Sequence, residues 1–455
     1  MAKPQQVIQN PQEEYRKKLV NAGEAVKLIR SKDRIQFGEF LSFPVECDAA
    51  LAKRKDELSD VRILVSTLVA VPQVTVSDPT QEHFITTDFS YSLVSRKLAD
   101  AGLLYYMPST YHEAYKIFRQ LPASERPTVA IVTVSPMDEN GYFSFGTTCS
   151  MNPLMLELVD RMIVEVNTNM PRVHGPQNFV HISQVDCVVE GKNPKLLQIP
   201  KPSFSESDDK IAQYIIKELE DGACLQLGIG SMPNRVGELI AQSDVKDLGV
   251  HTEMLVDSFV DMYNAGRITN LRKNIDKGQF VFTFAMGSDK LYNFLKDNPL
   301  CKAASPDYTN DPFVIAQNDK VFSVCSCLEV DLYGQVSSES MSARQISGIG
   351  GQFDFIFGSH RSNGGKGFTC MNSTATDNNG NLISRIVPGL EPCTAVSLPR
   401  FITYYIVTEY GIANMKGKPT WQRAEELIRI AHPDFRDELV KKAEKLKIWR
   451  RSNKR

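Results

Sequence analysis

The sequence predicts an α/β fold made of two tandem, similar, open α/β/α domains with largely parallel sheets and a cleft between them. Short runs of β-branched residues alternate with amphipathic helical segments, which is typical of parallel sheets covered by helices. Several short patterns from the first half return in the same order in the second half. The length of 455 residues favours two or three domains.

Individual elements follow from the periodicity of apolar residues. Helical spacing is visible over 12–30 and 208–220, and the runs over 127–135 and 160–168 read as buried strands. Two prolines and a polar cluster at 198–210 precede the second of these helices and mark a domain boundary. We therefore expect an N-terminal domain over 1–200, a C-terminal domain over 208–435, and a basic helix or tail over 436–455.

The internal repeat is the most informative feature of the chain. Segments 31–44 and 220–233 each carry a strand, a glutamine and a glycine, and DENGYFS (138–144) returns as DLYGQVS (331–337). The offset is about 190 residues in each case. Chance similarity explains one such pair but not an ordered set, so we infer a duplicated α/β domain.

Glu253 stands out in the segment LGVHTEMLVD (248–257), where a carboxylate follows a predicted buried strand. We expect Leu64 to occupy the register of Glu253 in the first half. Open α/β sheets bind ligands outside the carboxyl ends of their strands, so this is a place for chemistry. His251 lies two residues earlier, where it either orients the carboxylate or is an ordinary core histidine.

Two glycine-rich segments are candidates for ligand binding. LGIGSMP (227–233) follows a strand and opens a helix, so its amides can face an anion, although a plain strand–helix turn is the alternative. SGIGGQFDF (347–355) leaves its amides uncovered and is otherwise a bulge or turn. The candidate ligand-contacting residues are Gly228, Ile229, Gly230, Ser231, Met232, Gly348, Gly350 and Gly351, together with Lys366, which could reach a phosphate as a point charge.

Other chemistries find little support. Pro233 replaces the third glycine of a dinucleotide fingerprint, so no NAD site is expected, and no GxSxG elbow of a serine hydrolase is present. Cys325 and Cys327 have no second pair at ligand spacing, so no metal is expected. The 52 basic residues nearly balance 54 acidic ones, so neither nucleic acid nor an anionic membrane is an expected partner.

The cellular setting is also predicted. The nine cysteines are irregularly spaced, which favours reduced thiols, and the N-terminus lacks the apolar region of a secretory signal. We expect a cytoplasmic protein. The basic C-terminal run indicates either a solvated helix end or, as the alternative, an arm for nucleic acid.

The motifs LGIGSMPNRVGELI, GVHTEM, EVDLYGQV, SGIGGQFDF and VTEYGIANMKGK together resemble family I CoA-transferases. The likeness is to the single-chain acetyl-CoA hydrolase, 4-hydroxybutyrate and butyryl-CoA:acetate CoA-transferase group. It implies that Glu253 is the nucleophile, and that the amide of Ile229 and the loop at Gly351 contact the thioester and CoA. It also implies a homodimer or homotetramer that uses acyl-CoA without metal or NAD.

The resemblance implies transfer of CoA from a short-chain acyl-CoA to a small acid by ping-pong chemistry through a glutamyl-CoA thioester. The acid is of the 4-hydroxybutyrate, butyrate or acetate type, with itaconate and succinate as further candidates. The alternatives are a short-chain acyl-CoA hydrolase that uses the same glutamate, and a ligand-binding regulatory protein without catalysis. In this family the first domain shapes the acyl pocket, and segment 107–118 departs from the usual family pattern.

Overall fold

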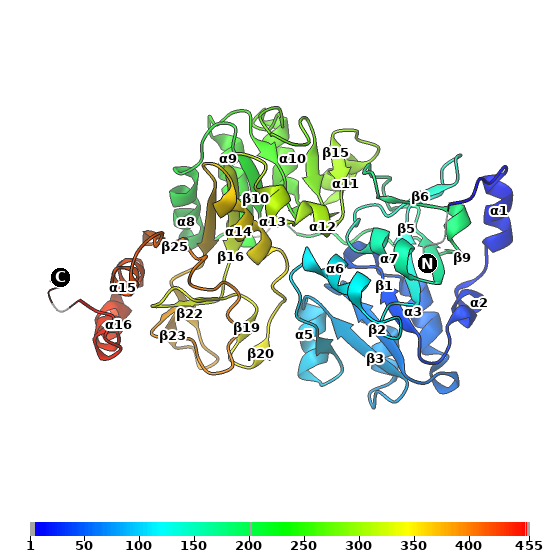
Figure 1. The fold of residues 1–455 in the computed structure, drawn as a ribbon, viewed down its shortest axis with the longest axis horizontal. Coiled ribbons are helices and arrows are strands. Elements are labelled where there is room, and N and C mark those ends of the chain that lie inside the picture. Colours follow the sequence, from blue (N-terminus) through cyan, green and yellow to red (C-terminus); the bar gives the residue numbers. More distant parts are fainter. Residues whose placement is uncertain (1–4, 201–202, 451, 453–455) are drawn as a thin grey trace. The chain divides into compact units, whose positions relative to one another are not determined.

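The computed structural model describes residues 5–200, 203–450 and 452. The chain forms two compact units, and Figure 1 labels many of their elements. The first unit holds the described residues up to Pro200 together with 253–257 and 279–309, and the second holds the described remainder. Two segments expected in the C-terminal domain therefore belong to the first unit. Among the described residues, no helix has the length and apolar character that a membrane span requires.

A seven-stranded parallel sheet forms the centre of the first unit, in the order β4-β3-β2-β1-β5-β7-β9. Its strands are β1 (Arg34–Phe37), β2 (Val61–Val65), β3 (Phe84–Asp88), β4 (Tyr105–Tyr106), β5 (Val129–Val134), β7 (Arg161–Val166) and β9 (Cys187–Glu190). The predicted strands over 127–135 and 160–168 are confirmed as β5 and β7.

Apolar side chains cover both faces of this sheet. In β5, Val129 and Ile131 belong to one core, whereas Ala130 and Val132 belong to the other. The first core includes residues of α2 (Ala22–Ala25), α3 (Val45–Ala52) and α5 (Leu93–Asp100), and the second includes residues of α6 (Glu113–Gln120) and α7 (Asn152–Leu158). The unit is thus an α/β/α sandwich, because alternate residues of a strand face opposite sides.

The predicted helical stretch 12–30 is divided in two. Helix α1 spans Pro11–Lys18, and Asn21 begins α2 by accepting a hydrogen bond from the amide of Glu24 over 2.9 Å. Between them the amide of Val20 donates to the carbonyl of Val188 over 2.9 Å. Pairing with β9 therefore interrupts the helix.

Several shorter elements complete the first unit. They are α4 (Gln73–Ser77), β6 (Tyr142–Ser144), β8 (Phe179–His181), β12 (Met254–Leu255), β13 (Phe280–Phe282), β14 (Phe284–Ala285), α11 (Asp289–Leu295), β15 (Cys301–Ala303) and α12 (Pro306–Thr309). Strands β6 and β8 pair antiparallel, whereas β12 pairs with β14 and β13 with β15 in parallel.

The second unit contains a six-stranded sheet in the order β11-β10-β16-β21-β25-β26. The strands are β10 (Cys224–Leu227), β11 (Gly249–Val250), β16 (Val321–Ser326), β21 (Lys366–Cys370), β25 (Tyr405–Thr408) and β26 (Gly411–Asn414). All neighbours are parallel except β25 and β26. The unit also contains three small antiparallel pairs of strands. They are β17 (Glu329–Asp331) with β18 (Val336–Ser337), β19 (Ser340–Met341) with β20 (Arg344–Gln345), and β22 (Thr374–Thr376) with β23 (Leu382–Ser384). Strand β24 (Ile386–Val387) pairs in parallel with β17.

Helices complete the second unit. They are α8 (Glu206–Ile216), α9 (Ser231–Gln242), α10 (Asp257–Asn264), α13 (Pro312–Ile315), α14 (Gln352–Arg361), α15 (Thr420–Arg429) and α16 (Pro433–Lys445). Helix α14 packs on β16 and β21, and α8 packs on β25. The predicted helix over 208–220 is confirmed in its N-terminal part as α8.

The basic C-terminal segment packs against the second unit. Leu439 and Ala443 of α16 and the following Ile448 are buried in its core, and the guanidinium of Arg450 lies 4.6 Å from the ring centroid of Trp421. This part is a helix end rather than an extended arm. Residues 451 and 453–455 of the predicted tail lie outside the described residues.

The two sheets share a strand order, with β2-β1-β5-β7-β9 in the first corresponding to β11-β10-β16-β21-β25 in the second. Hydrogen bonds follow the same pattern: the amide of Gly38 donates to the carbonyl of Ile131 over 2.8 Å, and that of Gly228 to Val324 over 2.8 Å. These matching contacts support the duplication inferred from the sequence.

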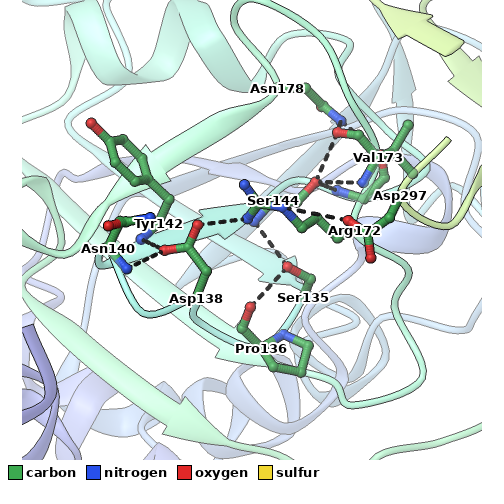
Figure 2. Close-up of polar contacts among 11 residues, drawn as sticks. Ser135, Pro136, Asp138, Asn140, Tyr142, Ser144, Arg172, Val173, Asn178 and Asp297 are labelled. Carbon is green, nitrogen blue, oxygen red and sulfur yellow. Dashed lines mark hydrogen bonds and ion pairs between the residues drawn. The ribbon is translucent and has the colours of Figure 1, made fainter. Parts of the chain in front are cut away.

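The repeated D-x-x-G turns are also equivalent. Figure 2 shows Asp138 accepting from the amides of Asn140 and Tyr142, with distances of 3.0 and 2.8 Å. Asp331 likewise accepts from the amide of Gln335 over 2.8 Å. In the first unit this turn borders a hollow of about 530 Å³, but Arg172 already pairs with Asp138 over 2.9 Å. The turn is therefore a structural motif.

One predicted register is wrong. Gln36 of β1 lies opposite Leu64, and Leu225 of β10 lies opposite Val250. The pairing therefore makes His251 the counterpart of Leu64, so Glu253 lies two residues further along. The physical reason is that the register of a strand is set by its hydrogen bonds to the neighbouring strand, which a match between two sequence segments does not determine.

Candidate active site

Glu253 lies in the bend between β11 and β12, at the point where the chain leaves the second sheet. The residue is partly exposed, while its neighbours Thr252 and Met254 are buried. Its carbonyl oxygen accepts hydrogen bonds from the amides of Thr283 and Phe284, over 3.0 and 3.2 Å. These two bonds hold the backbone that carries the carboxylate.

A loop of the first unit is joined to the same segment. The carbonyl of Thr283 accepts hydrogen bonds from the amides of Cys149 and Ser150, over 3.0 and 3.2 Å. The amide and carbonyl of Thr283 thus connect Glu253 to Ser150. Residues more than 100 positions apart in sequence are brought together in this way.

Tyr111 lies beside this junction and is partly exposed. Its hydroxyl forms a short hydrogen bond with the hydroxyl of Ser150 and donates to Oε2 of Glu39 over 3.4 Å. Burial raises the pKa of Tyr111 well above its usual value, and the charges of Glu39 and Glu253 raise it further. The phenol is therefore close to two carboxyl groups.

Glu39 follows β1 and is only 2% exposed. Burial raises the pKa of its carboxyl to about 8, the charge of Asp88 adds to this, and the amide of Met151 and the hydroxyl of Tyr111 partly offset it. The next residue, Phe40, stacks on Phe284 with ring centroids 3.7 Å apart. Since the amide of Phe284 donates to Glu253, this stacking places Glu39 in the same part of the unit.

The first glycine loop is built as predicted from a strand and a helix start. Gly230 adopts a φ of +129° and is the N-cap residue of α9, directly after Gly228 and Ile229. Ile229 is 61% exposed, which is unusual for an isoleucine. Together with the free amides at the start of α9, this exposed turn can receive an anionic or oxyanion ligand.

The second glycine loop lies near the first within the second unit. Gly350 adopts a φ of +50° and Gly351 is the N-cap residue of α14. The side-chain amide of Gln352 donates to the carbonyl of Ser326 over 3.0 Å, and a Cβ built on Gly230 would lie 4.0 Å from the hydroxyl of Ser326. Both loops therefore border the carboxyl end of β16, so the structure brings together the two predicted glycine segments.

Lys366 lies apart from the two glycine loops. It begins β21 opposite Phe322, four positions before the end of β16, and its ammonium pairs with a carboxylate oxygen of Glu218 over 3.0 Å. It thus lies at the amino edge of the sheet, whereas the glycine loops follow the carboxyl edge.

Two other sequence features are buried in the second unit. His251 is 1% exposed and lies 6.3 Å from the ring of Phe355, which belongs to the apolar core of the second unit. Cys325 and Cys327 are buried thiols. Within the described part of the chain, no group of three or more His, Cys, Asp or Glu residues is arranged to hold a metal ion.

Glu39 and Tyr111 are not among the site residues that the sequence predicts. One signal was available for each: Glu39 follows Gly38, as Ile229 follows the equivalent Gly228, and Tyr111 lies in segment 107–118, which departs from the family pattern. Neither signal indicated that the two side chains meet.

Comparison with known proteins agrees with the resemblance found in the sequence. The model of the acetyl-CoA hydrolase/transferase N-terminal domain matches residues 1–197, and that of the C-terminal domain matches 287–443. The chain belongs to the acetyl-CoA hydrolase/transferase family. It is 48% identical to the butyryl-CoA:acetate CoA-transferase of Anaerostipes caccae over 97% of this chain and 99% of that protein. It is 38% identical to the 4-hydroxybutyrate coenzyme A transferase of Clostridium kluyveri, over 95% and 99%.

Solved structures of the family have the same architecture. RipA from Yersinia pestis matches with a TM-score of 0.88 and 36% identity, over 96% of this chain and 99% of that chain. The 4-hydroxybutyrate CoA-transferase of Porphyromonas gingivalis matches with a TM-score of 0.76 and 32% identity, over 96% and 99%. The α/β fold with largely parallel sheets is confirmed.

Proposed function

We propose that this protein transfers coenzyme A from a short-chain acyl-CoA to a small carboxylic acid, with Glu253 as the nucleophile. The observation that carries the proposal is the placement of Glu253: a partly exposed carboxylate on a hydrogen-bonded bend after a strand, in a chain of this family. Ligands of open α/β sheets bind at such strand ends.

The reaction proceeds through covalent intermediates on this side chain. The Glu253 carboxylate attacks the thioester carbonyl, and the C–S bond breaks to give an acyl-glutamyl anhydride and the CoA thiolate. The thiolate attacks the glutamyl carbonyl and releases the first acid as its carboxylate, which leaves a glutamyl-CoA thioester. A second carboxylate then follows the same steps in reverse and leaves as its CoA ester.

The glycine loops of the second unit are proposed to bind the acyl-CoA. Their support is the pair of helix starts at α9 and α14, neither of which has a side-chain cap, because the positive end of a helix favours negative charge. The amide of Ile229 would stabilise the oxyanion of the tetrahedral intermediate, a contribution of about 3 kcal/mol for each well-placed donor. Gly351 and its neighbours would contact CoA.

The relatives favour a transferase over a hydrolase. Proteins named as butyryl-CoA:acetate or 4-hydroxybutyrate CoA-transferases match nearly the whole chain, whereas the acetyl-CoA hydrolase of Yarrowia lipolytica is 26% identical over 69% of it. Butyrate, acetate and 4-hydroxybutyrate are the first acids to test. We also propose that the protein acts in the cytoplasm, which its nine free cysteines support, as a homodimer or homotetramer.

The test combines intact-protein mass with exchange kinetics. After incubation with butyryl-CoA, the wild type should gain a CoA-sized adduct that acetate discharges. Glu253→Ala and Glu253→Gln should show no adduct and lose exchange by at least about 10³-fold, because the nucleophile is gone. Glu139→Gln, a change at an exposed glutamate of the first unit, should behave like the wild type.

Three outcomes would contradict the proposal. An adduct on Glu253→Ala would place the nucleophile elsewhere. CoA release that does not depend on added acid would indicate a hydrolase. Binding of acyl-CoA without adduct, exchange or hydrolysis would indicate a ligand-binding protein.

A further inference from the structure

Glu39 has an oxygen that the fold leaves without a partner. The Oε1 atom is buried and forms no hydrogen bond with any residue that the structure describes, while Oε2 accepts a long bond of 3.4 Å from Tyr111. Burying a carboxyl oxygen without a hydrogen bond costs stability. Such a group at a candidate active site is expected to serve a ligand rather than the fold.

The surroundings of Glu39 lead directly to Glu253. Tyr111 bridges them electrostatically, since both carboxylates raise the pKa of its phenol. Tyr111 and Glu253 are each partly exposed, whereas Glu39 is buried beside them. A small molecule that reaches the Glu253 carboxyl would therefore meet the Tyr111 hydroxyl and, behind it, the Glu39 carboxyl.

The duplication supports a role in ligand binding. Gly38 and Gly228 make equivalent hydrogen bonds at the ends of β1 and β10, so Glu39 is the counterpart of Ile229. In the second unit that position lies in the turn proposed to bind acyl-CoA. In the first unit it carries a carboxyl group instead of an exposed isoleucine.

We propose that the carboxyl group of Glu39, in its protonated form, and the hydroxyl of Tyr111 together bind the carboxylate of the acceptor acid beside Glu253. The inference rests on the proposed function and specifies how its second substrate is held. When the acid binds, the Tyr111 hydroxyl gives up its 3.4 Å bond to Oε2 of Glu39 and donates to one oxygen of the incoming carboxylate. The Glu39 carboxyl donates its proton to the other oxygen, and no covalent bond of Glu39 is made or broken.

The charges around Glu39 explain why it must be protonated. Asp88 at the end of β3 and Glu253 are the acidic groups that bear on Glu39 and Tyr111, and an ionised Glu39 would add a third negative charge. The pKa of Glu39 near 8 keeps its proton in place at neutral pH. In the thioester form Glu253 is uncharged, so the acceptor then meets two donors instead of repulsion.

The inference predicts different effects on the two substrates. Glu39→Leu removes the donor, so the KM for acetate as acceptor should rise about tenfold or more, as expected for a lost hydrogen bond to a charged group. The Kd for butyryl-CoA should stay within about threefold of the wild type, because the thioester has no free carboxylate, whereas release of butyrate should be affected like binding of acetate because it is the reverse step. Tyr111→Phe should raise the same KM by a smaller factor.

Glu39→Gln tests binding separately from folding. The side-chain amide of the glutamine still donates a hydrogen bond, but it does not ionise. The wild-type KM for acetate should increase above about pH 8, by up to tenfold per pH unit, whereas that of Glu39→Gln should stay flat. Glu165→Gln is the matched control: this glutamate is also buried and has a raised pKa, but its oxygens accept from the amides of Glu46 and Cys47. It should leave the KM unchanged.

The outcomes are distinguishable. An unchanged KM for acetate in folded Glu39→Leu, or the same pH profile in wild type and Glu39→Gln, would overturn the role of Glu39. If Glu39→Leu does not fold, the Glu39→Gln pH profile and Tyr111→Phe decide the question. Absence of the thioester in the wild type would instead overturn the proposed function.

Discussion

Buried carboxyl groups distinguish the first unit at the residue scale. Glu39 follows β1, and Asp88 is the last residue of β3 in the same sheet. Burial raises the pKa of Glu39 to about 8 and that of Asp88 to about 7. Asp88 is well supported, with hydrogen bonds from the hydroxyl of Ser95 and the amide of Ser90 over 2.6 and 2.8 Å. Glu39 is less well supported, because its bond from Tyr111 is 3.4 Å long and Oε1 has no hydrogen bond within the described residues, and we therefore assign it to substrate binding rather than to folding.

The raised pKa of Glu39 makes stability depend on pH. The folded state holds this proton more tightly than the unfolded chain, so stability falls as pH rises from about 4.5 to about 8. Glu39→Gln removes this contribution and should be more stable than the wild type at pH 8.5, on the order of 4 kcal/mol at most. Urea unfolding at pH 5.5 and 8.5 measures the difference.

The comparison needs an exposed glutamate as a control. Glu139→Gln should show nearly the wild-type stability at both pH values, because it removes no buried charge. If the difference between Glu39→Gln and the wild type were the same at pH 5.5 and 8.5, Glu39 would not ionise in this range.

At the scale of elements, the strand–glycine turns after β1 and β10 set the direction of the residue after each glycine. A Cβ on Gly38 would lie 2.1 Å from the carbonyl oxygen of Ser42, and a Cβ on Gly228 would lie 3.1 Å from that of Val324. The backbone therefore approaches a neighbouring carbonyl at both turns, and more closely at the first. This close approach orients Glu39 after the first glycine and Ile229 after the second.

Gly38→Ala should consequently disrupt the first turn. A contact of 2.1 Å with backbone cannot be relieved by rotating a side chain, so we expect a loss of about 3 kcal/mol or more in the free energy of unfolding. Gly389→Ala is the control, since a Cβ there meets nothing within 4 Å. Chemical denaturation of both variants measures the effect, and equal stabilities would show that the turn adapts to a side chain.

At the scale of the whole molecule, the burial of the cysteine thiols shows how closely the chain is packed. All nine cysteines are free, and seven of them are buried, with Cys187 intermediate and Cys393 exposed. Burial also raises the pKa of Cys224 to about 11 and that of Cys327 to about 12, which lowers their reactivity further.

A thiol reagent should therefore modify the native protein at one site quickly. We expect Cys393 to react first, Cys187 more slowly, and the buried thiols only on unfolding, when all nine should be titrated. Mass spectrometry after timed labelling identifies the sites. Rapid labelling of several buried cysteines in the native protein would contradict this packing.

Local patterns were sufficient to predict many elements. β-branched runs predicted β5 and β7, because a strand buried on both faces is apolar throughout. The repeat predicted two similar sheets, because the same short pattern of strand, glutamine and glycine occurs in both halves of the chain. Motifs close together in sequence were likewise enough to indicate the family and to propose Glu253.

Long-range contacts decided the rest. The helix that ends before Asn21 is interrupted because the amide of Val20 pairs with Val188 of β9. Lys366 lies away from the glycine loops because it begins β21, opposite Phe322 of β16. Glu39, Tyr111 and Ser150 meet through hydrogen bonds between separate segments, which no local pattern encodes. Burial then raises the pKa of Glu39, so the feature that makes it a candidate for binding a carboxylate arises only when the chain folds around it.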